Sequence, residues 1–503
     1  MFFYLRKTCD NRLTTALNFE EHSLYCLATV NAPTNRQMLI ASVVSGDCKI
    51  IIIIQTEMRK IFNIRLIILI FCGYTLSTIS VFAQKTEEDK NLNITTEKMK
   101  DIIKTLCNRL DTVYLYTENV NTIRKYLTQK MDQGEYTKFK TPTDFAFQLD
   151  ADLKYITNDK HMGIVYDPKK ATEMISQPTE NYYTKEVIED LKQKNFEFRE
   201  LKILEGNIGY MDLREFCPVK YAGETAVAAM NFLSNCSALI IDLRNNGGGD
   251  DNMVQFLMSY LLDGDIQFST SYNRYTNSYY VSQTFPYVPG KKLYNIPLYI
   301  LISKATFSGA EAFSYNLKAM KRATLIGENT RGGENPIEIQ VLTDGYIAYI
   351  PAVKILNSIA KTTIRWENIG VKPDIETDAK DALFRAQIKA LEELSNTNIS
   401  QKVSYQWILD GMKARQNSFV ADKRTLKSYV GTYGERKLIF ENGMLFYQRN
   451  GTEKLNLIGI DSDTFFIDGI DYLRLKIAKE NGKVKGLIRF YNDGTSKQDL
   501  KDN

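Results

Sequence analysis

The sequence predicts an α/β protein with a helical segment before its core and a small antiparallel β domain after it. Between residues 197 and 394, apolar strands alternate with amphipathic helices, and strands such as Ala238-Leu-Ile-Ile-Asp-Leu243 are continuous apolar runs. Such runs are typical of a buried, mostly parallel sheet. After residue 427, short strands separated by Asn-Gly turns predict the antiparallel domain. With 503 residues, the chain is long enough for about two to four domains.

The N-terminal part of the sequence has the pattern of a targeting signal. Basic Arg59 and Lys60 precede an apolar run from Leu66 that ends at Val81-Phe-Ala83, and a polar segment follows. This pattern predicts a secretory signal peptide over 58–83, and an N-terminal membrane anchor is the alternative. Because a signal peptide belongs at the start of a protein, we interpret residues 1–57 as a doubtful upstream extension. The chain is then expected to be exported to the periplasm, an outer-membrane-associated site or the exterior, with membrane contact only through this segment.

The composition argues against nucleic-acid binding, a disulfide framework and a metal site. The net charge is +4 and no long basic run occurs, which argues against nucleic-acid binding. After Ala83 the chain keeps three cysteines (Cys107, Cys217 and Cys236) and a single histidine, His161. An odd number of cysteines without a Cys-x-x-Cys pair predicts neither a disulfide framework nor a metal site, and we expect no cofactor.

The elements follow in order along the chain. Met99, Ile102, Ile103 and Leu106 form an apolar stripe at helical spacing, so a helical cap is expected over 96–175. The α/β core is expected over 197–394: a strand or hairpin at 203–213, helix 220–234, strand 238–243, helix 253–261, strand 297–302, helix 310–320, strand 323–326, an extended run 346–355 and a closing helix 378–394. A polar helical linker is expected over 395–425 and the β domain over 427–500.

Ser308 occupies a junction suited to acyl transfer. It follows the apolar run Pro297–Ile302 and precedes a segment in which apolar residues recur at helical spacing. A hydroxyl at the turn from a buried strand into a helix lies beside free backbone N–H groups, which acyl-transfer chemistry requires. The alternative is a helix N-cap, the commonest role for serine at this place.

Two further features support Ser308. The run Asp242-Leu-Arg-Asn-Asn-Gly-Gly-Gly249 places three glycines after a buried strand, where they let the backbone approach a ligand; a flexible turn is the alternative. No Lys-Ser or Lys-Thr follows, so a phosphate loop is disfavoured. A serine nucleophile needs a base, and His161 is the available histidine, although it could equally be a surface or core residue.

Together these segments resemble a known family. Lys160-His-Met-Gly-Ile-Val165, Leu239–Gly249, Thr306-Phe-Ser-Gly-Ala-Glu311, Ala323-Thr-Leu-Ile-Gly-Glu328 and Trp366-Glu-Asn-Ile-Gly-Val-Lys-Pro-Asp374 are similar, in order, to the motifs of the tail-specific (C-terminal processing) serine peptidases. The branch with interphotoreceptor retinoid-binding protein and tricorn-core domains is the nearest. The resemblance spans roughly residues 96–392 and implies a crotonase/Clp-protease-like core preceded by a helical cap.

The resemblance also implies roles for residues. Ser308 would be the nucleophile, His161 the general base and Glu367 the acidic residue of the Trp-Glu segment. The N–H of Gly309 and one from Gly247 or Gly248 would form the oxyanion hole.

The sequence departs from the family pattern at two positions. Gly333 stands where the processing-protease branch carries a lysine base, which makes His161 more necessary. Lys160 stands where the tricorn branch has a serine before its histidine, so either Asp159 or a backbone carbonyl is left to orient His161. No segment resembles a PDZ domain, and strict recognition of C-terminal tails is therefore not supported.

The expected function is that of an exported serine peptidase that cleaves peptides or unfolded proteins through an acyl-enzyme. The alternative is a non-catalytic exported binding protein for a hydrophobic ligand. Acyl-CoA chemistry on a crotonase-like fold is disfavoured, because export separates the chain from cytoplasmic CoA. No motif specifies an oligomeric state.

Overall fold

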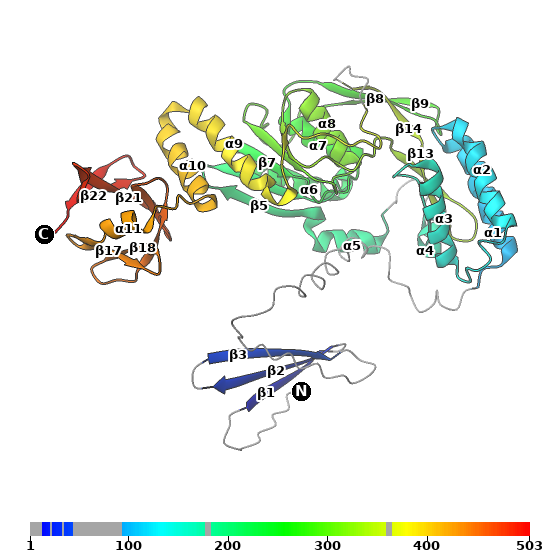
Figure 1. The fold of residues 1–503 in the computed structure, drawn as a ribbon. Coiled ribbons are helices and arrows are strands. Elements are labelled where there is room, and N and C mark those ends of the chain that lie inside the picture. Colours follow the sequence, from blue (N-terminus) through cyan, green and yellow to red (C-terminus); the bar gives the residue numbers. More distant parts are fainter. Residues whose placement is uncertain are drawn as a thin grey trace. The chain divides into compact units, whose positions relative to one another are not determined.

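The computed structural model describes residues 93–176, 183–358 and 365–502, together with the backbone of three N-terminal strands (Figure 1). The chain divides into two units, residues 1–84 and 85–503. In the first, β1 (Leu13–Glu20), β2 (Ser23–Ala32) and β3 (Asn35–Val43) form an antiparallel sheet in that order. The predicted signal peptide, 58–83, lies outside the described residues. Among the described helices, none has the length and apolar character needed to cross a membrane.

A six-stranded sheet forms the centre of the second unit, and its strand order is β15-β11-β10-β7-β6-β5. Only the β5–β6 pair in this sheet is antiparallel, and the other pairs are parallel. The strands are β5 (Phe198–Leu204), β6 (Ile208–Leu213), β7 (Ala238–Asp242), β10 (Leu298–Ile302), β11 (Thr324–Gly327) and β15 (Ile375–Glu376). The predicted α/β class with a mostly parallel sheet is confirmed.

Helices cover both faces of this sheet (Figure 1). One face packs on α6 (Val219–Phe232), α7 (Asp251–Leu261) and α8 (Gly309–Ala319), and the other on α9 (Ala382–Thr397) and α10 (Lys402–Gln416). Short 3₁₀ turns, η3 (Ala379–Asp381) and η4 (Ile399–Gln401), precede α9 and α10. Along β7, Leu239 and Ile241 enter the first core while Ala238 and Ile240 enter the second, as the period of a strand requires.

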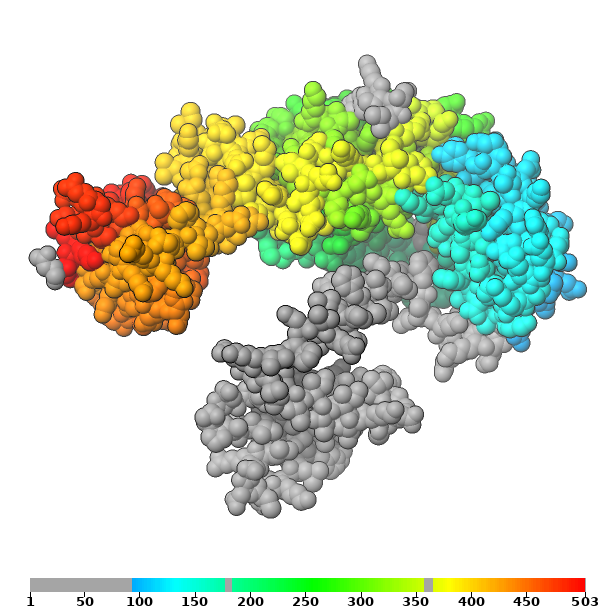
Figure 2. All heavy atoms as spheres, in the orientation of Figure 1, coloured from blue at the N-terminus to red at the C-terminus, as the bar shows by residue number. Residues whose placement is uncertain are grey.

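The segment expected as a linker takes part in this packing. Tyr405 and Leu409 of α10 are buried in the same cluster as Leu391 of α9. In Figure 2 the yellow and orange atoms of these helices lie against the green atoms of the core. Much of the segment 395–425 is helical, except for residues 417–422 between α10 and the next helix, and α10 also covers the sheet.

The cap combines helices with a sheet that the sequence pattern did not reveal. Its helices are α1 (Thr96–Val113), α2 (Thr117–Asp132) and α3 (Pro142–Thr157), and its sheet has the order β12-β13-β4. These strands are β4 (Gly163–Tyr166), β12 (Ile337–Val341) and β13 (Tyr346–Pro351). Helices α4 (Pro168–Ser176) and α5 (Lys185–Gln193) and the turn η2 (Asn195–Glu197) lead from β4 to β5.

The expectation that the run 346–355 belongs to the α/β layer is therefore wrong. β13 pairs with β4 of the cap, whereas β14 (Val353–Ser358) pairs with β8 (Gln267–Asn273), which in turn pairs with β9 (Ser278–Gln283). Side-chain alternation marks residues as extended but carries no information on a partner far away in the sequence, which is why the pattern alone misplaced them.

The C-terminal domain is an antiparallel meander of eight strands in sequential order, after the short helix α11 (Lys423–Ser428). Its strands are β16 (Gly431–Tyr433), β17 (Arg436–Glu441), β18 (Met444–Arg449), β19 (Leu455–Gly459), β20 (Thr464–Ile467), β21 (Ile470–Glu480), β22 (Lys483–Tyr491) and β23 (Ser496–Leu500). A separate core that includes Tyr429, Tyr433 and Leu438 holds them together. This confirms the antiparallel β fold that the turn pattern predicts.

Candidate active site

Ser308 lies on a tight turn between β10 and α8. Its backbone has φ +52° and ψ −120°, a conformation that is costly for a residue with a side chain and that clusters at functional sites. Thr306 fixes the turn, because its hydroxyl accepts the N–H of Ser303 at 2.9 Å and donates to the carbonyl of Leu243 at 2.8 Å. The turn is thereby fastened to the end of β7.

The structure brings Ser308 and His161 together. Ser308 Oγ lies 2.9 Å from His161 Nε2, although the serine belongs to the core and the histidine precedes β4 of the cap. The imidazole packs on Phe307, with 4.5 Å between ring centroids. Burial, reinforced by the positive charge of Arg331, lowers the pKa of His161 to about 4. At neutral pH the imidazole is therefore neutral and able to accept a proton.

Glu311 organises the surroundings of Ser308. Its side chain is fully buried, and Oε2 accepts the N–H groups of Ser308 at 2.9 Å and Gly333 at 2.7 Å. Oε1 accepts the N–H of Gly332 at 2.7 Å and the Thr330 hydroxyl. This carboxylate was not among the predicted site residues. The available signal was the Ser-x-x-Glu spacing, which by itself indicates only a residue in the first turn of a helix.

The glycine loop lies against Ser308. A Cβ on Gly248, whose φ is +106°, would stand 2.7 Å from Ser308 Cβ, so only glycine permits this approach. However, the Gly247 N–H donates to the Arg214 carbonyl at 3.3 Å and the Gly248 N–H to Asn246 Oδ1 at 2.8 Å. Both groups thus already have partners within the protein, and the expectation that one of them serves an oxyanion stays a prediction.

Two other backbone N–H groups near Ser308 could stabilise an oxyanion. The amides of Gly309 and Gly249 donate to no acceptor within the part of the chain that the structure describes. A Cβ built on Gly309 would stand 3.4 Å from the nitrogen of Gly249, so the two residues are neighbours. Gly309 is one of the donors that the sequence names, and Gly249 is a further candidate beside Gly247 and Gly248.

Glu367 belongs to a buried polar cluster but does not contact His161 directly. Its Oε2 accepts the N–H of Glu334 at 2.6 Å and Asn335 Nδ2 at 3.3 Å, and burial raises the pKa of Glu367. Its Oε1 is buried and, like His161 Nδ1 and Asp159 Oδ2, has no hydrogen-bond partner among the described residues. Buried polar atoms of this kind are usually satisfied by ordered water.

Asp159 reaches His161 through the backbone. Its Oδ1 accepts the His161 N–H at 3.0 Å, while burial and the charge of Glu367 raise the pKa of Asp159 to about 6. Lys160, which replaces the serine of the tricorn branch, donates instead to the carbonyl of Arg331. Of the two alternatives for orienting His161, Asp159 is thus the one in hydrogen-bond contact with it, at the main chain.

The glycine at position 333 has a steric explanation. A Cβ there would lie 2.6 Å from His161 Cε1 and 2.2 Å from Phe307 Cε2. The side chains of His161 and Phe307 already occupy the space that a residue larger than glycine needs. A lysine at 333 and a histidine at 161 therefore exclude one another in this arrangement.

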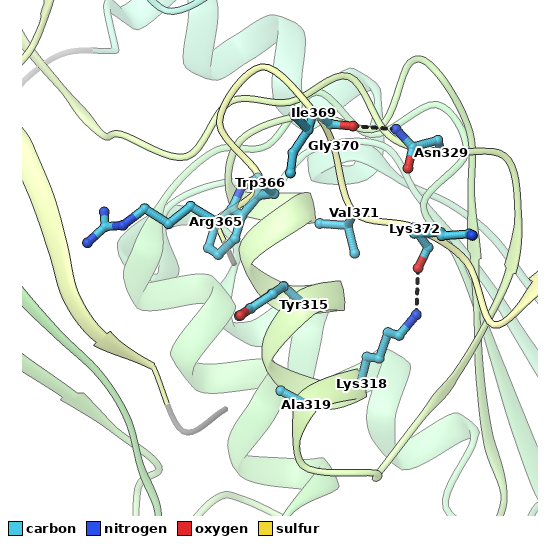
Figure 3. Close-up of a pocket in the computed structure, with 10 residues that line it drawn as sticks. All are labelled: Tyr315, Lys318, Ala319, Asn329, Arg365, Trp366, Ile369, Gly370, Val371 and Lys372. Atoms are coloured by element: carbon cyan, nitrogen blue, oxygen red, sulfur yellow. Dashed lines mark hydrogen bonds between the residues drawn. The ribbon is translucent and has the colours of Figure 1, made fainter. Parts of the chain in front are cut away.

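A cavity of about 540 Å³ lies beside the site, between α8 and the loop 365–372 (Figure 3). Tyr315 and Trp366 form its apolar wall, with ring centroids 4.6 Å apart. The Trp366 indole N–H donates to the Gly333 carbonyl at 3.0 Å, which ties this loop to the segment beside His161. Neither Ser308 nor His161 lines the cavity. Within the described residues, no cluster of His, Cys, Asp and Glu could hold a metal ion.

Comparison with known proteins gives a consistent family. Residues 207–377 match the model of peptidase family S41, and residues 87–201 match the N-terminal domain of Peptidase_S41 in eukaryotic IRBP. The chloroplastic carboxyl-terminal-processing peptidase 3 of Arabidopsis thaliana is 26% identical over 169 residues, which are 33% of this chain and 31% of the relative. The chain thus spans about a third of the length of that curated relative.

Among solved structures, a lipoprotein from Streptococcus agalactiae matches with a TM-score of 0.42 and 17% identity, over 60% of this chain and 98% of that one. The photosystem II D1 C-terminal processing protease matches with a TM-score of 0.36 and 14% identity, over 57% and 94% of the two chains.

Proposed function

The chain belongs to peptidase family S41, and on this premise we propose that it is an exported serine peptidase that hydrolyses peptide bonds through an acyl-enzyme. The observation that carries the proposal is the 2.9 Å contact between Ser308 Oγ and His161 Nε2, on a strained turn beside two free backbone amides. Peptides or unfolded proteins are the substrates. The export rests on the sequence pattern of residues 58–83.

The geometry supports the following sequence of steps. His161 Nε2 takes the proton of Ser308 Oγ while Oγ attacks the carbonyl carbon of the peptide bond, and the N–H groups of Gly309 and Gly249 stabilise the oxyanion. The C–N bond then breaks, and His161 gives its proton to the departing amine. Water attacks the acyl-enzyme, again with His161 as base, and the carboxylic acid leaves while Ser308 recovers its proton.

The carboxylates of Glu367 and Asp159 stabilise the protonated, positively charged form of His161. His161 becomes positively charged during each proton transfer, in surroundings that disfavour that charge. Glu367 and Asp159 lie in the adjoining cluster and offset this cost, as a third group does in other serine hydrolases. Ordered water between Glu367 Oε1 and His161 Nδ1 would satisfy both unpartnered atoms.

A non-catalytic role is the second candidate, and the Trp366 cavity favours it. Its aromatic wall and its volume of about 540 Å³ suit an apolar ligand, at a place that does not include Ser308.

A fluorophosphonate probe tests the catalytic proposal directly. We expect the probe to label wild-type protein at Ser308, identified by mass spectrometry of the labelled peptide, because only an activated serine reacts. Ser308→Ala should not be labelled. Ser314→Ala, which removes a hydroxyl bonded within α8 to the Ala310 carbonyl, should be labelled normally. A folded wild-type protein that stays unlabelled would contradict catalysis and favour the binding role.

The pH dependence of kcat/KM reports the state of the base. Because His161 must be neutral and its pKa is about 4, activity should persist at pH 5.5 and be lost as the pH falls through about 4. Arg331→Gln removes a nearby positive charge, so it should raise the pKa of His161 and move the acid limb to higher pH. The control Lys304→Gln, at a side chain 82% exposed, should leave the limb in place. An acid limb near pH 6.5 in the wild type would contradict the lowered pKa of His161, and a limb that Arg331→Gln leaves in place would contradict His161 as the base.

A further inference from the structure

A second cavity, of about 470 Å³, lies between the cap and the sheet of β14, β8 and β9. On the sheet, Lys354 lies opposite Tyr272, which lies opposite Tyr279, so the three residues form a row across the strands. The two tyrosine rings pack with centroids 5.1 Å apart. The other lining residues are Leu115, Tyr116 and Glu118 of the cap, Arg274, Leu356 and Arg365.

The charges of this cavity favour an anion. Arg274, Lys354 and Arg365 line it, against the single lining carboxylate of Glu118, and of the three cations only Arg365 has an ion pair among the described residues, with Glu334 at 3.5 Å. Arg274 donates to the main-chain carbonyls of Tyr114 at 3.0 Å and Asp111 at 2.8 Å, which orient its guanidinium without neutralising it. Lys354 has no ion pair or side-chain hydrogen bond to any residue that the structure describes. A carboxylate that enters the cavity could thus bind both the oriented guanidinium of Arg274 and the unpaired ammonium group of Lys354.

The rim of the cavity suits an extended chain with apolar side chains. β9 is an edge strand of its three-stranded sheet, so its outer N–H and C=O groups pair with no other strand that the structure describes. Tyr279 and Val281, on the same face of β9, are 69% and 55% exposed. Proteins usually protect such an apolar edge, and an exposed one is suited to pairing with an added strand.

The cavity adjoins the acidic end of the active site. Asn335 Nδ2 donates both to the Tyr116 hydroxyl at 2.9 Å and to Glu367 Oε2 at 3.3 Å. Arg365 lies two residues before Glu367, and Figure 3 shows its side chain directed away from Trp366 and the first cavity. A chain bound along β9 would therefore end beside the residues that surround His161.

We propose that this cavity is a substrate subsite, which binds a polypeptide segment that carries an acidic side chain next to an aromatic or aliphatic one. The carboxylate meets Lys354 and Arg274, and the apolar side chain packs on Tyr272 and Tyr279. The inference rests on the proposed function, since it names the substrate class for that active site.

The test measures binding to the inactive Ser308→Ala protein, so that cleavage does not intervene. The probes are fluorescent ten-residue peptides, acetylated and amidated at their ends, that contain Glu-Phe pairs or the matched Gln-Phe pairs. We expect the Glu peptide to bind about tenfold more tightly by fluorescence anisotropy, with an advantage that shrinks at high salt. Adding Lys354→Glu should remove this preference. The control Lys497→Glu, an equal charge change at an exposed residue of β23, should keep it.

Each outcome has a defined meaning. Equal affinity for the two peptides, or an acidic preference unaffected by Lys354→Glu, would overturn the subsite. A further peptide has the same sequence but a free C-terminal carboxylate. If only this peptide binds, the subsite is also overturned, in favour of recognition of chain ends. If wild-type protein reacts with the fluorophosphonate while no acidic peptide binds, the subsite fails and the peptidase function stands. If the acidic peptide binds but Ser308 never reacts, the cavity is a peptide-binding site, and both the peptidase function and the role of the cavity as a substrate subsite fail.

Discussion

Ser308→Ala should abolish hydrolysis of an unstructured peptide, with kcat lower by a factor on the order of 10⁴ to 10⁶. The substitution removes the attacking oxygen and leaves nothing for His161 Nε2 to deprotonate at 2.9 Å. Alanine tolerates the positive φ of this position no worse than serine does, so the fold should persist. The measurement is the rate of peptide cleavage under single-turnover conditions, with circular dichroism to establish that the variant is folded.

Ser314→Ala provides the matched comparison, because it changes a buried serine of the same helix. Its cleavage rate should stay within a few-fold of the wild type. A Ser308→Ala protein that retains the wild-type rate would refute Ser308 as the nucleophile.

Gly333→Ala should reduce kcat/KM by a factor of about 10² to 10⁴, the range associated with a displaced general base. A single methyl group at 333 would stand 2.6 Å from His161 Cε1, so the imidazole must move away from Ser308. The reaction with fluorophosphonate should slow in parallel, because that reaction depends on the same contact. KM should change less than kcat, since the substitution affects the base and not a substrate contact.

A structural collapse must be distinguished from this displacement. Urea denaturation of Gly333→Ala should show a transition with an unchanged slope, as expected when the extent of buried surface is preserved. Gly223→Ala in α6 is the control for adding a methyl group, and it should leave activity intact. Full activity in a folded Gly333→Ala protein would contradict the steric account of this position.

The sequence could point to Ser308 and His161, because each stands in a motif with a chemical reason: a strand-to-helix turn for one, and the last remaining histidine for the other. It was insufficient for the oxyanion donors. Three consecutive glycines are equivalent as letters, and only the hydrogen bonds of Gly247 and Gly248 show that their amides are occupied. Glu311 was missed for a similar reason, since three of its four donors (Thr330, Gly332 and Gly333) come from a loop some twenty residues downstream.

The sequence pattern was also insufficient to predict which strands pair when they lie far apart along the chain. The strand at 346–351 is plainly extended from its residues, but its partners, β4 and β12, follow from packing against the helices of the cap. The position of Glu367 relative to His161 depends on the same long-range arrangement, so the motif could name this residue without placing it.

The pairing of β13 with β4 also sets when the site can exist during synthesis. β4, the strand that follows His161, cannot pair until β13 has been synthesised, and Ser308 is translated before β13. A nascent chain that has emerged only as far as Ser308 thus holds its histidine on an unfinished cap. The sheet that follows His161 can therefore be completed only after Ser308 and the rest of the chain up to β13 have been synthesised.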